Sequence, residues 1–502
     1  MFFLKLSVDY RFIIWIFLRL LALIYIFAFA SMAVQIEGLI GTHGILPIEV
    51  KLQELSNVIP NQKYWFFPSV FWFTASDSAL LWVCYFGVIS ATSLFIDRAS
   101  AVSLFVCYIL YLSIAFAGQD FTAFQWDGLL LEVGFLAIFL TWGSGWVVFL
   151  YQFLLARFMF MSGVVKLASG DPNWSGLTAL NYYYQTQPLP SSFAWYAHHL
   201  PQWFHKLSVL GVFFIELIVP VLMFIPGKFR SLVALCFVIL QLFIILTGNY
   251  GFFNFLVIIL CLFLFNDRDV TPFLSKRMVK HIYLRSHLPG LKAHISAVVF
   301  TAVVLMVCGA DVWQASTRKQ VIQPLAMLQQ TVKHLSIINN YGPFAVMTTI
   351  RREIIIEGSN DGKIWFPYHF KYKPGSVEKA LTWVIPHQPR LDWLMWFQAL
   401  DKRPTDGWFF SFIKRIKEGS PQVTALLAGN PFPTTPPNYV RALIYQYRFT
   451  TPQERRINGQ IWQSNTPGIY WTEFYSQDSL NQNIAPNWLN GTSRDNVLLL
   501  RQ

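Results

Sequence analysis

The chain has 502 residues, of which 55% are hydrophobic, 17% aromatic and only 13% charged. Soluble domains carry roughly 25% charged residues, so this composition excludes an ordinary soluble protein and indicates a polytopic membrane protein. The formal net charge of +12 does not indicate a nucleic-acid partner, because the densest basic segment lies between two hydrophobic runs, where it determines topology.

About nine hydrophobic runs approach or exceed the roughly 20 residues that a helix needs to cross a bilayer. The fourth and the eighth are short, so we expect each to be tilted into its neighbours, re-entrant or merged with a flanking segment. The runs predict a polytopic α-helical membrane domain over residues 1–313. They are 12–34, 70–95, 101–117, 128–142, 146–165, 207–225, 231–247, 252–265 and 295–313.

Lysine and arginine in the short loops predict the orientation of the chain. With a cytoplasmic N-terminus, eleven basic residues lie in inner segments and four in outer segments, as the positive-inside rule requires. The C-terminal part is then lumenal, at an endoplasmic reticulum membrane, in a eukaryote, or periplasmic, at the inner membrane, in a bacterium. The inner residues are Lys5, Arg11, Arg98, Lys228, Arg230, Arg268, Lys276, Arg277, Lys280, Arg285 and Lys292, and the outer ones are Lys51, Lys63, Lys166 and Lys206.

Three outer connections, 35–68, 118–128 and 166–206, are longer or richer in aromatic residues than the inner ones. Tryptophan and tyrosine gather at membrane interfaces for purely structural reasons, which explains most of these rings. The third connection also holds three histidines, but no cysteine or metalloprotease spacing accompanies them, so we expect no metal site. All five cysteines lie in apolar runs, which argues against disulfides.

The composition changes after Trp313, and residues 314–502 are long enough for a soluble domain with its own core. The Asn-Asp-Gly triplet at 360–362 predicts a hairpin, with one strand before Ser359 and a second through Tyr372. Further periodic segments predict an α+β domain that contains a sheet. These are two helices at 391–400 and 408–418 and a strand at 439–449.

Charged side chains inside hydrophobic runs are costly in a bilayer, so each is a candidate site residue. Counting helical rise from the ends of the runs predicts two layers. Asp127, Glu132 and Lys166 form an outer layer, and Arg157 pairs with Glu216 near the midplane. The pair of Arg157 with Glu216 also has a structural interpretation, as an ion pair that fixes helix register. For Lys166 two interpretations stay open: a side chain that snorkels to the headgroups, or a site residue.

Six segments in chain order resemble the lipase maturation factor family, over nearly the whole length of the chain. The resemblance implies a membrane-embedded, chaperone-like factor of the endoplasmic reticulum for the folding and maturation of secreted lipases, with a lumenal C-terminal domain. The partners that it implies are a secreted, lipase-like client protein and membrane lipids. The segments are GLIGTHGILP from Gly38, FQWDGLLLEVGFLAIFL from Phe124, RFMFMSGVVKLASGDPNWSGLTALNYYYQTQPLP from Arg157, ELIVP from Glu216, GNYGFFNFL from Gly248 and EIIIEGSNDGKIW from Glu353.

A second resemblance covers only the membrane half. The run SGVVKL followed by DPNW is similar to the segment of vitamin K-dependent gamma-glutamyl carboxylases that carries their lysine base. It implies Lys166 as a base, with Trp174 as the aromatic residue after it, and a pocket between the helices for an amphiphile, a lipid or a quinone. In an enzyme of this kind we expect Glu132 or Asp127 to set the charge of Lys166. Trp126-Asp127 stands where those enzymes have asparagine and histidine, which places quinone chemistry in doubt. The candidate cofactor-binding residues are Trp126, Trp174, Tyr182, Arg157 and Glu216.

The function that we expect is therefore a non-enzymatic maturation or assembly factor for secreted proteins. The alternative is an integral-membrane enzyme that uses Lys166 as a base on a lipid-soluble cofactor or lipid substrate. A transporter has less support, because the two halves show no inverted repeat.

Overall fold

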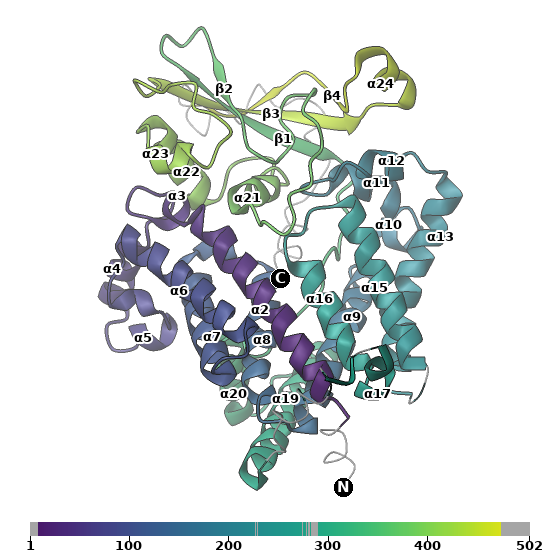
Figure 1. The fold of residues 1–502 in the computed structure, drawn as a ribbon. Coiled ribbons are helices and arrows are strands. Elements are labelled where there is room, and N and C mark those ends of the chain that lie inside the picture. Colours follow the sequence, from purple (N-terminus) through teal and green to yellow (C-terminus); the bar gives the residue numbers. More distant parts are fainter. Residues whose placement is uncertain are drawn as a thin grey trace.

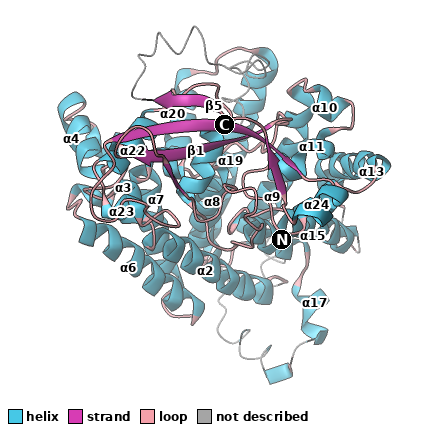
Figure 2. Cartoon of the chain, turned by 90° about the horizontal axis from the view of Figure 1, so that it is seen from above, coloured by secondary structure: helices cyan, strands magenta, loops and turns pink. Residues whose placement is uncertain are grey.

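The computed structural model describes residues 9–225, 227, 229–273, 275–277, 279, 282 and 290–472. A helix bundle makes up most of the molecule, and an antiparallel sheet with short helices lies across one end of it (Figure 1). Seen from above, the strands cross over the tops of the bundle helices (Figure 2). Several predictions fall outside the described residues: the basic residues Lys5, Lys228, Lys280 and Arg285, and the last part of the predicted domain, 473–502.

Within the described residues, seven helices are long and apolar enough to cross a membrane, so the chain is an integral membrane protein. The fourth and eighth predicted runs form shorter helices, α8 (Gln125–Leu140) and α16 (Phe253–Leu260), which η4 (Cys261–Leu264) continues. Buried residues occur all round α8, so protein surrounds it and it does not need the length of a lipid-exposed span. The seven are α2 (Arg11–Ala33), α6 (Asp77–Phe95), α7 (Ser100–Ala117), α9 (Gly145–Ala168), the segment Gln202–Leu222, α15 (Phe229–Thr247) and α19 (Leu291–Thr317).

The segment Gln202–Leu222 changes its helical pitch once. It begins as α13 (Gln202–Phe213), continues as the π-helix η3 (Phe214–Ile218) and ends as α14 (Val219–Leu222). The outer connections fold into short helices. These are α3 (Ile36–Ile40), α4 (Ile48–Val58) and α5 (Lys63–Phe66) in the first, η2 (Gln119–Thr122) in the second, and α10 (Pro172–Ser175), α11 (Ala179–Thr186) and α12 (Ala194–His198) in the third.

Five strands form the C-terminal sheet, in the order β2-β1-β3-β4, with β5 also pairing with β3. The predicted hairpin is present, because the Asp361 carboxylate accepts hydrogen bonds from the backbone N–H groups of Lys363 and Ile364, and Gly362 adopts a φ of 70°. Its second strand is shorter than expected. The strands are β1 (Arg351–Ser359), β2 (Phe366–Tyr368), β3 (Tyr439–Phe449), β4 (Trp462–Ser464) and β5 (Gly468–Thr472).

The helices of the C-terminal part include both of the predicted ones. These are α21 (Arg390–Gln398) and α22 (Gly407–Lys417). The predicted strand at 439–449 is confirmed as β3, with the bounds expected. The remaining described helices are η1 (Val70–Trp72), α17 (Asp267–Val270), η5 (Thr271–Phe273), α20 (Gln323–His334), α23 (Pro421–Thr424) and α24 (Pro452–Asn458).

Helix α21 connects the sheet to the bundle. It lies below the sheet in Figure 1, and all of its residues are buried. The indole N–H of Trp396 donates to the backbone carbonyl of Thr186 at 2.7 Å. Arg390 reaches α8, where its guanidinium binds the two carboxylate oxygens of Asp127 at 2.5 and 2.7 Å. The hydroxyl of Tyr111, on α7, donates to the same carboxylate at 2.6 Å.

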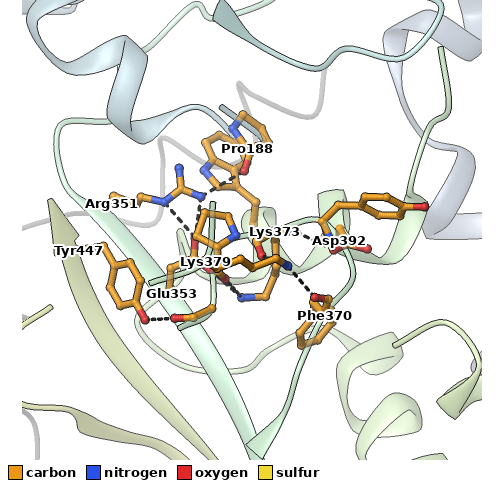
Figure 3. A network of polar contacts seen from close by, with 12 residues as sticks. Pro188, Arg351, Glu353, Phe370, Lys373, Lys379, Asp392 and Tyr447 are labelled. Carbon is orange, nitrogen blue, oxygen red and sulfur yellow. Dashed lines mark hydrogen bonds and ion pairs between the residues drawn. The ribbon is translucent and has the colours of Figure 1, made fainter. Parts of the chain in front are cut away.

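Arg351, at the start of β1, also attaches the sheet to the bundle, through contacts with the third outer connection (Figure 3). Its guanidinium donates to the backbone carbonyls of Gln185, Gln187 and Pro188 at 2.8, 2.5 and 3.1 Å. The same group binds the carboxylate of Glu353 at 2.6 Å, so its charge is compensated although the side chain is only 1% exposed. The sheet is therefore attached to the bundle by charged groups as well as by apolar packing.

We predict that Arg390→Met strongly destabilises the folded chain, because the Asp127 carboxylate then stays buried without a cation. Breaking a buried pair in this way costs about 3–5 kcal/mol. The matched control is Arg448→Met, since the Arg448–Glu454 pair is exposed (47% and 34%) and such pairs contribute less than about 1 kcal/mol. Chemical denaturation in detergent measures both free energies of unfolding. Equal losses of unfolding free energy in Arg390→Met and Arg448→Met would contradict the stabilising role of the Arg390–Asp127 pair.

The contact between α2 and the segment before α21 predicts a dependence of stability on pH. A ring nitrogen of His387 lies 2.9 Å from the hydroxyl of Ser31, and burial, followed by the charges of Arg390 and Lys371, lowers the pKa of His387 from 6.5 to about 4. The unfolded chain therefore binds more protons between these two values, and stability is lost as pH falls from 6.5 to 4. We expect a loss on the order of 2 kcal/mol. The free energy of unfolding, measured at stepped pH, should depend less steeply on pH in His387→Asn than in the wild type. An unchanged slope of this free energy against pH would exclude His387 as the cause.

Candidate functional site

Lys166 lies near the end of α9 and is buried, with 4% of its surface exposed. Its ammonium donates to the two carboxylate oxygens of Glu216 at 2.9 and 2.8 Å and to the backbone carbonyl of Ser162 at 2.9 Å. These three acceptors match the three N–H bonds of a lysine ammonium. The ammonium also lies 5.4 Å from the ring centre of Trp174, within the range of a cation–π contact. Lys166 is thus held inside the protein and does not snorkel.

A close approach of two helices makes this pair possible. Gly163 of α9 packs against η3, where an added Cβ would come within 2.7 Å of the Leu217 side chain and 3.1 Å of the Glu216 Cβ. Any larger residue at position 163 would separate the helices. The π-turn adds a residue to the helical turn that contains Glu216, and such turns recur at functional sites.

The loop after Lys166 is anchored by the chain that leads into the sheet. Asp171 caps α10 by accepting from the backbone N–H of Asn173 at 2.9 Å, and its second oxygen accepts from the N–H of Met347 at 2.6 Å. The indole N–H of Trp174 donates to the carbonyl of Phe344 at 3.0 Å. The aromatic ring beside Lys166 is therefore positioned by residues more than 150 positions away in the sequence.

A second buried pair joins Arg157 of α9 to Glu132 of α8. The other oxygen of Glu132 accepts from the hydroxyl of Tyr341 at 2.6 Å and from the backbone N–H of Asn339 at 3.0 Å. Arg157 also contacts the sulfur of Cys308, on α19, at 2.9 Å. This pair therefore binds α8, α9 and α19 to the start of the C-terminal part.

The two predicted charge layers are wrong in their pairing. Arg157 pairs with Glu132 rather than with Glu216, and Lys166 pairs with Glu216 rather than with the outer carboxylates. Asp127 binds Arg390 instead of joining an outer cluster. The predicted levels of Glu132 and Glu216 were therefore exchanged, because the bounds of the runs, on which the count of helical rise depends, do not fix where a helix begins or how its pitch changes.

A cavity of about 110 Å³ adjoins the Lys166–Glu216 pair, between α9, α13, α15, α16 and the segment at 343–347. Trp174 lines it, and so do Asn254 and Gln241, whose amides are hydrogen-bonded to each other at 2.7 Å. The amide oxygen of Asn254 is buried and has no hydrogen-bond partner among the described residues. This arrangement is a mainly apolar cavity with a few fixed polar groups, as in sites for small amphiphiles.

Of the other predicted binding residues, Trp126 lines a neighbouring cavity. Tyr183 lines the Lys166 cavity in the place that we expected for Tyr182. Arg157 belongs to its pair with Glu132. Sequence reasoning missed Asn254, although an amide inside an apolar run is a detectable signal. Other residues that it missed, and that had no such signal, are Gly163, Gln241, Tyr341 and Arg390.

We predict that Lys166→Met costs about 3–5 kcal/mol, because the Glu216 carboxylate is left buried without a cation. The double variant Lys166→Met/Glu216→Met replaces both charges with apolar chains of similar length and should recover most of this loss. Chemical denaturation in detergent of both single variants, Lys166→Met and Glu216→Met, and of the double variant measures the coupling. Losses in the double variant that equal the sum of the single losses would show that the two side chains act independently.

Comparison with known proteins covers both halves of the chain. Residues 13–272 match the model described as the lipase maturation factor transmembrane domain, and residues 337–472 match the lipase maturation factor C-terminal domain. Lipase maturation factor 2 of Xenopus laevis is 32% identical, over 88% of this chain and 79% of the relative. The human protein of the same name is also 32% identical, over 89% and 80%.

Lipase maturation factor 1 of Bos taurus is 30% identical, over 94% of this chain and 90% of the relative. No solved structure matches the chain. Because the two models match in order and the relatives align over most of both lengths, this chain belongs to the lipase maturation factor family.

Proposed function

We propose that this chain is a membrane-embedded factor that helps exported lipase-like proteins fold and assemble, without itself catalysing a reaction. The observation that carries the proposal is the match of both family domains, in order, over residues 13–272 and 337–472. A lipase maturation role is what the names of the relatives have in common. The partners are a secreted client and the lipids around the bundle.

The geometry of Lys166 supports a structural part for this residue. Three acceptors, the two carboxylate oxygens of Glu216 and the backbone carbonyl of Ser162, surround its nitrogen, and this arrangement favours the charged ammonium. A general base needs a free lone pair within reach of its substrate, and the ammonium form has none. We therefore assign Lys166, Glu216, Arg157 and Glu132 to the fixed frame of the bundle.

The client-binding surface that we propose consists of the three outer connections together with residues 337–472, and we call it the outer platform. Its parts contact one another closely. Arg415 and the Ser420 hydroxyl donate to the carbonyls of Gly44 and His43, both at 2.8 Å. Segments in direct contact lie on one side of a membrane, and the distribution of basic residues assigns that side to the lumen or the periplasm.

We predict that deleting the gene in its native host lowers the activity of one or more exported lipases per unit of lipase protein, while their transcripts stay constant. The physical reason is that misassembled lipase accumulates when the outer platform is absent. Activity assays on immunocaptured lipase, with quantitative blots and transcript measurements, check this outcome. Unchanged specific activity across the exported lipases would refute the proposal.

Re-expression of variants in the same deletion strain separates the assembly role from the enzyme alternative. Lys166→Arg keeps the positive charge facing Glu216 but supplies no neutral amine. The assembly role predicts roughly the wild-type lipase yield per folded copy of the variant. An enzyme that uses Lys166 as a base would lose its function in this variant while its abundance in the membrane stayed normal. Arg448→Met, in the exposed pair, is the control for expression.

A further inference from the structure

A second cavity, of about 70 Å³, lies where the bundle meets the C-terminal part. The start of α8, α16 and α21 surround it, together with Pro343 and Phe344. Eight of the twelve residues that line it are aromatic, and none of the twelve is charged. The other four are Ala123, Gln125, Pro188 and Pro343. Its aromatic lining residues include Phe124, Trp126, Phe253, Trp393 and Phe397.

Two of these residues carry hydrogen-bond donors that nothing in the described chain accepts. The indole nitrogens of Trp126 and Trp393 are both buried and have no partner, and the residues are 6% and 3% exposed. Their rings meet edge to face, with centroids 4.7 Å apart. A buried donor without an acceptor costs free energy, so two of them in one cavity wall call for an explanation.

Other tryptophans at the same boundary are satisfied. The indole N–H groups of Trp174, Trp195 and Trp396 donate to backbone carbonyls at 3.0, 3.0 and 2.7 Å. Backbone carbonyls thus satisfy these three indoles, whereas Trp462, in β4, is a further buried indole without an acceptor in the described part of the chain. At Trp126 and Trp393 the neighbours are mainly rings and a cavity, so a molecule bound in the cavity is a candidate source of the acceptor.

We propose that this cavity binds the ester end of a neutral acyl lipid, with one carbonyl oxygen accepting from both indoles and the adjoining methylenes packed on Phe124, Phe253 and Phe397. A carbonyl oxygen has two lone pairs and so can accept from both donors. The ligand is neutral, because a carboxylate in a lining without any cation would pay an uncompensated desolvation cost. This assignment goes beyond the proposed function and does not depend on which client is bound.

The position of the cavity fits such a ligand. Trp126 lies in the first turn of α8, and Trp393 belongs to the helix that connects the sheet to the bundle. Tryptophan is enriched at this level, the interface between hydrocarbon and headgroups. The cavity also shares four wall residues with the Lys166 cavity, Tyr250, Phe253, Pro343 and Phe344, so a ligand in one lies against the wall of the other.

The test compares two ligands that differ in one carbonyl. Radiolabelled 1-octanoylglycerol (an ester) and 1-O-octylglycerol (its ether analogue) are bound to the full chain in a maltoside detergent, which has no carbonyl of its own. We expect saturable binding of the ester to be tighter by about fivefold for each hydrogen bond gained. Octanoic acid, as its anion, should bind more weakly than the ester.

Variants of the chain test whether the two indole N–H groups cause the preference for the ester. Trp126→Phe and Trp393→Phe keep the rings but remove the donors, so each should reduce the preference for the ester, and the double variant should abolish it. Ala123→Phe, at the exposed mouth of the cavity, should block both ligands. Trp203→Phe, at a tryptophan that is 66% exposed and remote from the lining, should change nothing.

Three outcomes would overturn the assignment. The first is the absence of saturable ester binding, which would leave water as the acceptor for the two indoles. The second is an ester preference that persists in the double variant. The third is tighter binding of the octanoate anion than of the ester. A mild-detergent thermal-stability assay on each variant confirms that it is folded before binding is scored.

Discussion

Buried charge is the constraint on which this molecule depends. Lys166 with Glu216, Arg157 with Glu132 and Arg390 with Asp127 place six charges in the interior, with side chains at most 13% exposed. In a medium of low dielectric constant each of these ions is tolerated only with its partner in place. The first two pairs fix how α9 is rotated against η3 and α8, and the third attaches α21 to the bundle. Helix rotation and domain attachment are therefore consequences of the same electrostatic requirement.

The secondary structure of the C-terminal part could be predicted because its signals are local. The Asn-Asp-Gly turn and the alternation at 439–449 depend on neighbours a few residues apart, and β3 has the bounds expected. The partners of the buried charges could not be predicted. Asp127, which accepts from Arg390, is 263 positions away from it in the sequence. Glu216 lies in a π-turn, which the hydrophobic periodicity of the sequence does not predict. The heights of Glu132 and Glu216 in the membrane were predicted wrongly as well, because each carboxylate reaches the α9 cation that was expected at the other level.

The tryptophans of the third outer connection illustrate the same limit. Sequence composition favoured an enrichment of aromatic rings at the membrane surface for purely structural reasons. Trp174 and Trp195 instead donate to carbonyls of Phe344 and Thr450, in the C-terminal part. These rings join two halves of the chain that a domain boundary at 313 would separate.

Arg351 has a mechanical consequence. Its guanidinium holds the carbonyls of Gln185, Gln187 and Pro188, a stretch that begins two residues after Tyr183, itself part of the wall beside Lys166. A displacement of β1 would therefore be passed through this short peptide to Tyr183 in the cavity wall. A protein that bound the sheet and displaced it would also change the shape of the cavity beside Lys166.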